Sequence, residues 1–241
     1  MVRIEFLFPE VANLYGDPFN VKYLKNSLKD AEVIETTLTD EPRFVNEEID
    51  MIYMGSMSEK AQVIIIEKLK KYKNELQEFI NKNKVVLFTG NAFEILGKYI
   101  EDEEQNKIEG LGIIDTYAII DRKHRYNTLF LGELNCEEKL KILGFKATFS
   151  FSYTDNTKDY FCKSIRGCGN HKESNLEGIR IKNLFGTYLI GPLLIINPKF
   201  TKYIMRLLGE DNPELQFEKE AMDCYEEKLK IFEKQEINYL Q

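Results

Sequence analysis

The stretch that decides the fold is Val85-Val-Leu-Phe-Thr-Gly-Asn-Ala-Phe-Glu-Ile-Leu-Gly97. It begins with a short apolar run, 85–89, which is typical of a buried strand, and passes through Gly90 and Asn91 into a short helical segment that Gly97 closes. In open α/β sheets, ligands bind beyond the carboxyl ends of the strands, and nucleophiles often stand on a sharp strand-to-helix turn of this kind. Gly90 stands at the tip of this turn, and it has no side chain with which to attack a substrate.

The residues before this turn alternate between short apolar runs and longer amphipathic segments, which predicts parallel strands joined by helices. We expect an α/β fold with a mostly parallel central sheet flanked by helices. Asp17 with Pro18 predicts the start of a first helix, and Ser58 predicts the start of one long helix that reaches Asn81. The expected strands are 4–8, 33–37, 51–54 and 85–89.

The chain between residues 111 and 189 changes to β-rich segments, which predict an added sheet or antiparallel strands that complete the parallel one. These segments are 113–120, 128–131, 145–153 and 184–189. A helix is expected over 198–208 and a highly charged one from Pro213 onward. We therefore divide the chain into a domain, 1–208, and a C-terminal helix, 209–241.

The C-terminal helix carries Leu215, Met222 and Leu229 at intervals of seven, with Tyr225 and Phe232 between them. This pattern predicts a terminal helix that packs on its own domain. The alternative is a partner-binding or coiled-coil face.

Composition excludes several classes of protein. The 241 residues include 33 Lys+Arg and 40 Asp+Glu, a net charge of −7, which argues against nucleic-acid binding because phosphate contacts need a basic face. The 4 cysteines have no CxxC spacing, which argues against a disulfide framework or a zinc site and predicts reduced thiols in the cytoplasm. No apolar stretch is long enough to span a membrane. We expect neither a metal nor a cofactor.

The chain carries several motifs in a fixed order: Pro9-Glu-Val-Ala-Asn-Leu-Tyr-Gly-Asp17, Asp50-Met-Ile-Tyr-Met-Gly-Ser-Met-Ser58, the 85–97 stretch, Gly110-Leu-Gly-Ile-Ile-Asp115, Gly167-Cys-Gly-Asn-His171, Glu177-Gly178 and Gly186-Thr-Tyr-Leu-Ile-Gly-Pro-Leu-Leu194. Together these motifs resemble the cobyric acid synthase type of class I glutamine amidotransferase. Within that type they look most like the glutaminase subunit of lipid II isoglutaminyl synthase, the partner of a Mur-ligase-like chain. The resemblance covers roughly residues 4–208 and implies a Rossmann-like (flavodoxin-like) class I glutamine amidotransferase fold.

The resemblance implies where catalytic residues would stand, and this chain departs from the family there. The family places a nucleophilic cysteine on the turn and a histidine after the Gly-Thr-Tyr-Leu motif. This chain has Gly90 and Ile190 at those positions. A thiolate attacks the glutamine amide while the imidazole takes its proton, and glycine and isoleucine can do neither. We therefore expect no catalytic residues of this type.

A remnant of the glutamine pocket is expected around the turn. The resemblance implies that backbone N–H groups after the third strand face the oxyanion; there Gly55 remains, while Ser56 and Met57 occupy a turn that is usually glycine-rich. Glu94 stands where the family usually has glutamine. The expected pocket residues are Gly55, Ser56, Met57, Asn91, Glu94 and Tyr188. Asn13, Tyr15, Gly16 and Asp17 follow the first strand; we interpret them as a turn and helix cap, with contact to a ligase partner as the alternative.

A relocated nucleophile is the alternative to loss of catalysis. Cys162 and Cys168 lie in a β-rich stretch near His171, so a Cys/His pair is conceivable. The leading hypothesis is a catalytically degenerate amidotransferase-like protein that binds or regulates a Mur-ligase-like partner. The other hypotheses are an active amidotransferase subunit for cell-wall precursor or corrinoid amidation, and a sensor of an amino acid or related small metabolite.

Overall fold

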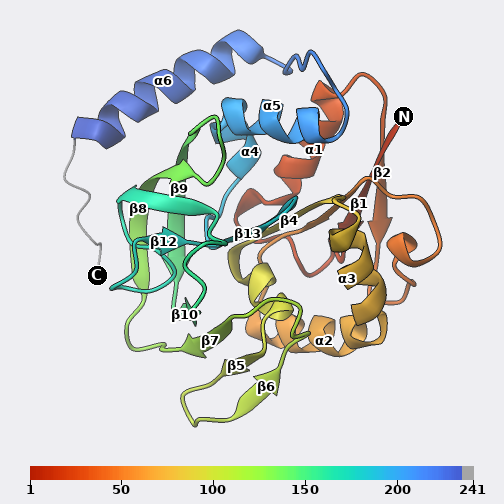
Figure 1. Cartoon of the computed structure of the whole chain (residues 1–241), viewed down its shortest axis with the longest axis vertical. Coiled ribbons are helices and arrows are strands. Elements are labelled where there is room, and N and C mark those ends of the chain that lie inside the picture. Colours follow the sequence, from red (N-terminus) through yellow and green to blue (C-terminus); the bar gives the residue numbers. More distant parts are fainter. Residues whose placement is uncertain (235–241) are drawn as a thin grey trace.

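The computed structural model describes residues 1–234, and these form a mixed central sheet with the strand order β13-β14-β4-β3-β1-β2 (Figure 1). Neighbouring strands run parallel, apart from the antiparallel pair β13 and β14 at one edge. The α/β prediction is therefore confirmed. The strands of this sheet are β1 (Val2–Leu7), β2 (Ala31–Thr36), β3 (Met51–Met54), β4 (Val85–Thr89), β13 (Ile179–Ile181) and β14 (Leu184–Thr187).

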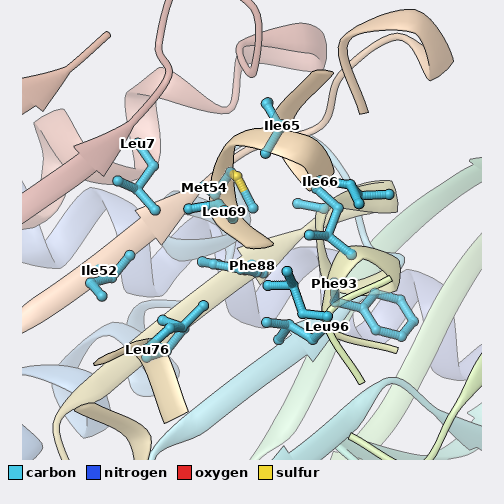
Figure 2. Packing of buried hydrophobic residues seen from close by; sticks show 14 of the residues in the cluster. Leu7, Ile52, Met54, Ile65, Ile66, Leu69, Leu76, Phe88, Phe93 and Leu96 are labelled. Carbon is cyan, nitrogen blue, oxygen red and sulfur yellow. The ribbon is translucent and has the colours of Figure 1, made fainter. Parts of the chain in front are cut away.

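Helices cover both faces of the central sheet (Figure 1). On one face lie α1 (Pro18–Ser27), α4 (Leu193–Ile196) and α5 (Pro198–Leu207), and on the other lie α2 (Glu59–Leu69) and α3 (Lys73–Asn81). Strand β3 serves both layers because side chains alternate along a strand: Ile52 and Met54 join the α2 and α3 side, whereas Met51 and Tyr53 join the other. Figure 2 shows the α2 side, where Leu69 and Leu76 pack toward the sheet. Short 3-10 helices are η1 (Leu14–Gly16), η2 (Arg43–Val45), η3 (Lys70–Tyr72) and η4 (Gly90–Leu96).

Two smaller sheets extend the molecule, as the β-rich central segment predicts. Their orders are β10-β7-β5-β6 and β12-β11-β8-β9. The predicted strand over 145–153 is wrong in one respect: β9 and β10 belong to different sheets, and the chain changes sheet at Phe149. The strands are β5 (Tyr99–Glu101), β6 (Lys107–Glu109), β7 (Tyr117–Ile120), β8 (Tyr126–Leu134), β9 (Lys141–Thr148), β10 (Ser150–Tyr153), β11 (Cys162–Arg166) and β12 (Leu176–Glu177).

Two predicted helix features need correction. The single helix expected from Ser58 to Asn81 is broken by η3, although Ser58 does cap α2 by accepting a hydrogen bond from the backbone N–H of Ala61 at 3.2 Å. Asp17 is not a side-chain cap for α1. Its carboxylate is instead directed toward the end of β3, where it accepts a hydrogen bond from the backbone N–H of Ser56.

The C-terminal helix α6 (Glu218–Lys234) packs on its own chain (Figure 1). Tyr225, 2% exposed, lies against Leu131 and Leu143 with Leu229 and Phe232 alongside, and its hydroxyl donates a hydrogen bond to the Lys141 carbonyl at 2.8 Å. This contact favours the first interpretation of the sevenfold pattern. The part of the predicted helix over 235–241 lies outside the described residues. Within 1–234 no helix is both long and apolar enough to cross a membrane.

We expect Tyr225→Ala to lower the free energy of unfolding by about 3 kcal/mol, because it removes a buried aromatic ring and a partly buried hydrogen bond. Ile231→Ala is the matched control on the same helix, since Ile231 is 47% exposed; a change below about 0.5 kcal/mol is expected there. Urea denaturation measures both. Equal effects of the two substitutions would contradict the packing of α6 on the domain.

Candidate functional site

The site is built where three parallel strands end side by side. Strand β4 lies between β3 and β14, with Phe88 opposite Met54 and Thr89 opposite Thr187. The segments that follow these strands, 55–57, 90–91 and 188–190, therefore meet at one edge of the sheet. This is the edge at which open α/β sheets bind ligands.

Gly90 forms a left-handed turn directly after β4, with φ +61°. This conformation costs a non-glycine residue about 1–3 kcal/mol. A Cβ atom added to Gly90 would lie 2.8 Å from the Ser56 Cβ and would overlap the Ser56 Oγ. The side chain of Ser56 thus occupies the space in which a side chain at the tip of the turn would begin.

Gly55 brings the β1–α1 loop against the end of β3. A Cβ there would lie 2.6 Å from the Ala12 carbonyl oxygen and 2.8 Å from the Asp17 Cβ. Because no Cβ is present, the Asp17 Oδ2 reaches the Ser56 N–H at 2.6 Å and the Thr89 hydroxyl at 3.2 Å. Gly55 thus allows the β1–α1 loop to pack closely against the backbone after β3. The pocket wall itself is formed by its neighbours Ser56 and Met57.

Asp17 is fully buried beneath the turn, and burial raises its pKa from 3.8 to about 6. Its Oδ1 has no hydrogen-bond partner among residues 1–234. The layer below is polar as well: the Tyr53 hydroxyl lies 3.0 Å from the Thr89 Oγ1 and accepts a hydrogen bond from the Asn20 side-chain N–H at 2.9 Å. Asn20 in turn accepts from the Leu194 N–H at 2.8 Å, which fixes the loop after β14. The turn therefore rests on a buried polar network.

Glu94 lies in η4 and is 3% exposed. Its Oε1 accepts a hydrogen bond from the Tyr188 hydroxyl at 2.6 Å, and its Oε2 accepts one from the Gln62 side-chain N–H at 2.9 Å. Burial raises the pKa of Glu94 above its ordinary value. Sequence reasoning placed Glu94 and Tyr188 in the pocket but missed Gln62. The sequence does contain a feature that could have identified Gln62. It is a polar residue on the otherwise apolar buried face of α2, which continues with Ile65, Ile66 and Leu69.

A small pocket of about 60 Å³ opens at the turn. Of the residues expected to form it, Gly55 is not on its wall. Tyr15, on the loop after β1, and Ile190, which follows β14, also line the pocket. The positions that the resemblance assigns to nucleophile and base therefore share one cavity. The expected residues that line it are Ser56, Met57, Asn91, Glu94 and Tyr188, and Gly90 lines it as well.

A buried ion pair behind the pocket was not anticipated from sequence. Lys146 and Glu177 are 1% and 0% exposed, and their charged atoms lie 3.5 Å apart. Glu177 also accepts hydrogen bonds from the Thr187 hydroxyl and the Tyr188 N–H, both at 2.9 Å, so the pair holds the end of β14 in place. In this part of β9 the usual burial of apolar and charged side chains is reversed: the apolar Phe145 is 36% exposed, whereas its charged neighbour Lys146 is buried.

Cys162 and Cys168 are both buried, and burial raises the pKa of each thiol. Neither cysteine lines the pocket at the turn, and neither does His171. The His171 ring stacks on Tyr153 at 4.6 Å, and its Nδ1 lies 3.2 Å from a carboxylate oxygen of Glu173. In the part of the chain that the structure describes, no group of three His, Cys, Asp or Glu residues could hold a metal ion.

A family model for CobB/CobQ-like glutamine amidotransferase domains matches residues 3–196. The chain belongs to the CobB/CobQ-like glutamine amidotransferase family. Two similar family members are the glutamine-hydrolysing GatD subunits of lipid II isoglutaminyl synthase from Staphylococcus aureus and Streptococcus pneumoniae. The Staphylococcus aureus protein is 32% identical, and the match covers 80% of this chain and 78% of the relative. The Streptococcus pneumoniae protein is 27% identical, and the match covers 81% of this chain and 76% of the relative.

Solved structures show the same fold at low sequence identity. A structure of PurLQS from Thermotoga maritima has a TM-score of 0.57 at 12% identity, covering 95% of this chain and 99% of that one. The glutaminase domain of the Trypanosoma brucei CTPS with bound acivicin has a TM-score of 0.51 at 9% identity, covering 90% and 99%. The class I glutamine amidotransferase fold is therefore confirmed.

We expect the Asp17→Asn variant to lose less stability than the parent as pH rises. The folded-state pKa of Asp17 is raised, so the stability from its protonated form is fully present below pH 3.8 and is lost as pH rises through about 6. Between pH 4 and 7 the parent should lose about 2–3 kcal/mol more than the variant. Urea denaturation at the two pH values measures this difference, and parallel pH profiles for the two proteins would contradict it.

Proposed function

We propose that this family member no longer hydrolyses glutamine and serves as a binding or regulatory subunit of a Mur-ligase-like partner. The observation that carries the proposal is the steric relation between Gly90 and Ser56. A nucleophile at the turn would need a Cβ in the space that the Ser56 side chain fills. The site is thus altered in shape as well as in chemistry.

The position of Ile190 supports the same conclusion. Ile190 is 6% exposed, and its backbone N–H donates a hydrogen bond to the Phe145 carbonyl at 2.9 Å. The side chain presents hydrocarbon to the pocket where the resemblance implies a histidine, so it can neither take a proton from a thiol nor donate one to departing ammonia. Both halves of the catalytic pair are replaced, and such residues act as a unit.

The relatives support a partner of the ligase class. Both are named as subunits of lipid II isoglutaminyl synthase, which supports a role for this chain in amidation of a cell-wall precursor. The β1–α1 connection and the first turn of α1 expose three apolar side chains close together in the sequence: Leu14, Tyr15 and Phe19 are 39%, 48% and 54% exposed. Of these, Tyr15 lines the pocket. Exposed apolar groups that cluster at a site are typical of protein interfaces. A partner docked there would receive ammonia from solution.

The alternative, an active glutaminase with a relocated nucleophile, has less support. An attacking cysteine needs a thiolate and access to substrate, whereas Cys162 and Cys168 are buried with raised pKa values. His171 is held by Tyr153 and Glu173. The geometry therefore favours the pseudoenzyme proposal.

The first test is ammonia release from glutamine by the purified chain. We expect none above background, and none from Gly90→Cys/Ile190→His, because Ser56 still fills the space that the new side chain needs. Addition of Ser56→Gly should let the triple variant form a γ-glutamyl thioester with glutamine, with release of ammonia, or a covalent thiol adduct with a glutamine-mimicking electrophile, each detected by mass spectrometry. Ammonia release by the natural chain that disappears on Cys162→Ser or Cys168→Ser would overturn the proposal.

The partner is tested by affinity capture from the source cells. We expect a Mur-ligase-like chain to co-purify, and the complex to form amides with ammonium salts but not with glutamine. Tyr15→Asp should reduce capture at least about tenfold, because a charge on a rim residue opposes desolvation. Ile165→Asp is the matched control, since Ile165 is 53% exposed but does not line the pocket. Recovery without a ligase-like chain would contradict this part of the proposal.

A further inference from the structure

Several buried polar atoms without a hydrogen-bond partner belong to residues that line the pocket at the turn. Among residues 1–234, four buried side-chain oxygens have no hydrogen-bond partner, and three of them belong to residues that line this pocket: Ser56 Oγ, Glu59 Oε1 and Ser150 Oγ. Ser56 and Ser150 are 2% and 5% exposed. Ser56 is a neighbour of Asp17, and Ser150 is a neighbour of Glu94 and Tyr188, yet neither hydroxyl forms a hydrogen bond of normal geometry with these groups. Because unpaired buried polar groups are costly, their concentration around one cavity points to a guest that binds them.

The charged residues that line the pocket indicate which class of ligand it can bind. Two carboxylates, Glu59 and Glu94, line the pocket, and no Lys, Arg or His residue does. The Glu59 Oε2 is paired with the Arg122 guanidinium, but its Oε1 is the buried, unpartnered oxygen. Glu94 already accepts hydrogen bonds from Tyr188 and Gln62, and a carboxylate can accept more. Burial raises the pKa of Glu94, and a cation in the pocket would offset this effect. These acceptor oxygens therefore favour a positively charged guest that donates hydrogen bonds.

The size of the cavity favours a small guest. About 60 Å³ is room for a guest of a few atoms, since one water needs about 10–15 Å³ on this measure and pockets for larger ligands span about 300–1,000 Å³. We propose that the pocket binds an ammonium ion, whose N–H groups donate to Ser56, Ser150 and the two carboxylates. This inference deepens the proposed function by naming ammonium as the ligand of the altered site.

The test uses the purified full chain without a partner. Binding of ¹⁵N-ammonium is followed by NMR, and thermal melting is compared in NH₄Cl, KCl and NaCl at equal ionic strength, because a ligand that binds only the folded state raises its stability. We expect a protected ammonium signal and a higher melting temperature in NH₄Cl than in the other salts. Equal melting in all three salts with no protected signal would overturn the proposal. Equal stabilisation by K⁺ would also overturn it, because K⁺ has no N–H donors.

Two serines on the same strand provide matched variants. Ser150→Ala removes an unpartnered hydroxyl, so it should leave the fold at least as stable and weaken ammonium binding by about tenfold or more. Ser152→Ala removes the hydroxyl that lies 2.7 Å from the Tyr188 hydroxyl outside the pocket wall, so it should destabilise the fold and keep the ammonium effect. Should Ser150→Ala fold poorly, Ser56→Ala removes another unpartnered hydroxyl. Unchanged binding in the serine-to-alanine pocket variants would overturn the assignment.

These outcomes separate the ammonium site from the proposed function. A chain that releases no ammonia from glutamine and binds no ammonium retains the pseudoenzyme role and loses the ammonium site. A chain that binds ammonium and also hydrolyses glutamine retains the site and loses the pseudoenzyme role.

Discussion

The site depends on one steric constraint, the mutual exclusion of a side chain at position 90 and the side chain of Ser56. The turn after β4 is left-handed at Gly90, so glycine relieves the backbone strain that another residue would store there. The space released by the missing side chain is filled by Ser56. The glycine at position 90 and the serine at position 56 are therefore sterically matched, and the turn after β4 is closely packed.

The polar groups around this turn show that the site has not become an ordinary core. Asp17 is buried below it with an unpartnered oxygen, and Glu94 is buried beside it with two hydrogen-bonded donors. Carboxylates in such surroundings reduce stability unless they are paired or serve a ligand. The acidic groups and hydroxyls around a small cavity are the physical basis for expecting that this pocket binds a ligand.

The fold was largely predictable from sequence because strand periodicity and turn residues are local signals. The strand 85–89 and the Gly90 turn follow from their own residues. Long-range polar contacts were not predictable: Asp17 has the sequence features of a helix cap, yet its carboxylate bonds to the Ser56 N–H, 39 residues away. The Lys146–Glu177 ion pair could not be predicted from sequence either, because its burial depends on how the sheets pack and not on residues adjacent in the chain.

A double-mutant cycle between positions 56 and 90 tests the central claim most directly. Gly90→Ala should be strongly destabilising in the natural background and much less so in Ser56→Gly, because the second change removes the overlapping atoms. The account predicts a coupling of about 1–3 kcal/mol in the free energy of unfolding, measured by urea denaturation. Effects that add within about 0.5 kcal/mol would show that Ser56 does not occupy the place of the lost side chain.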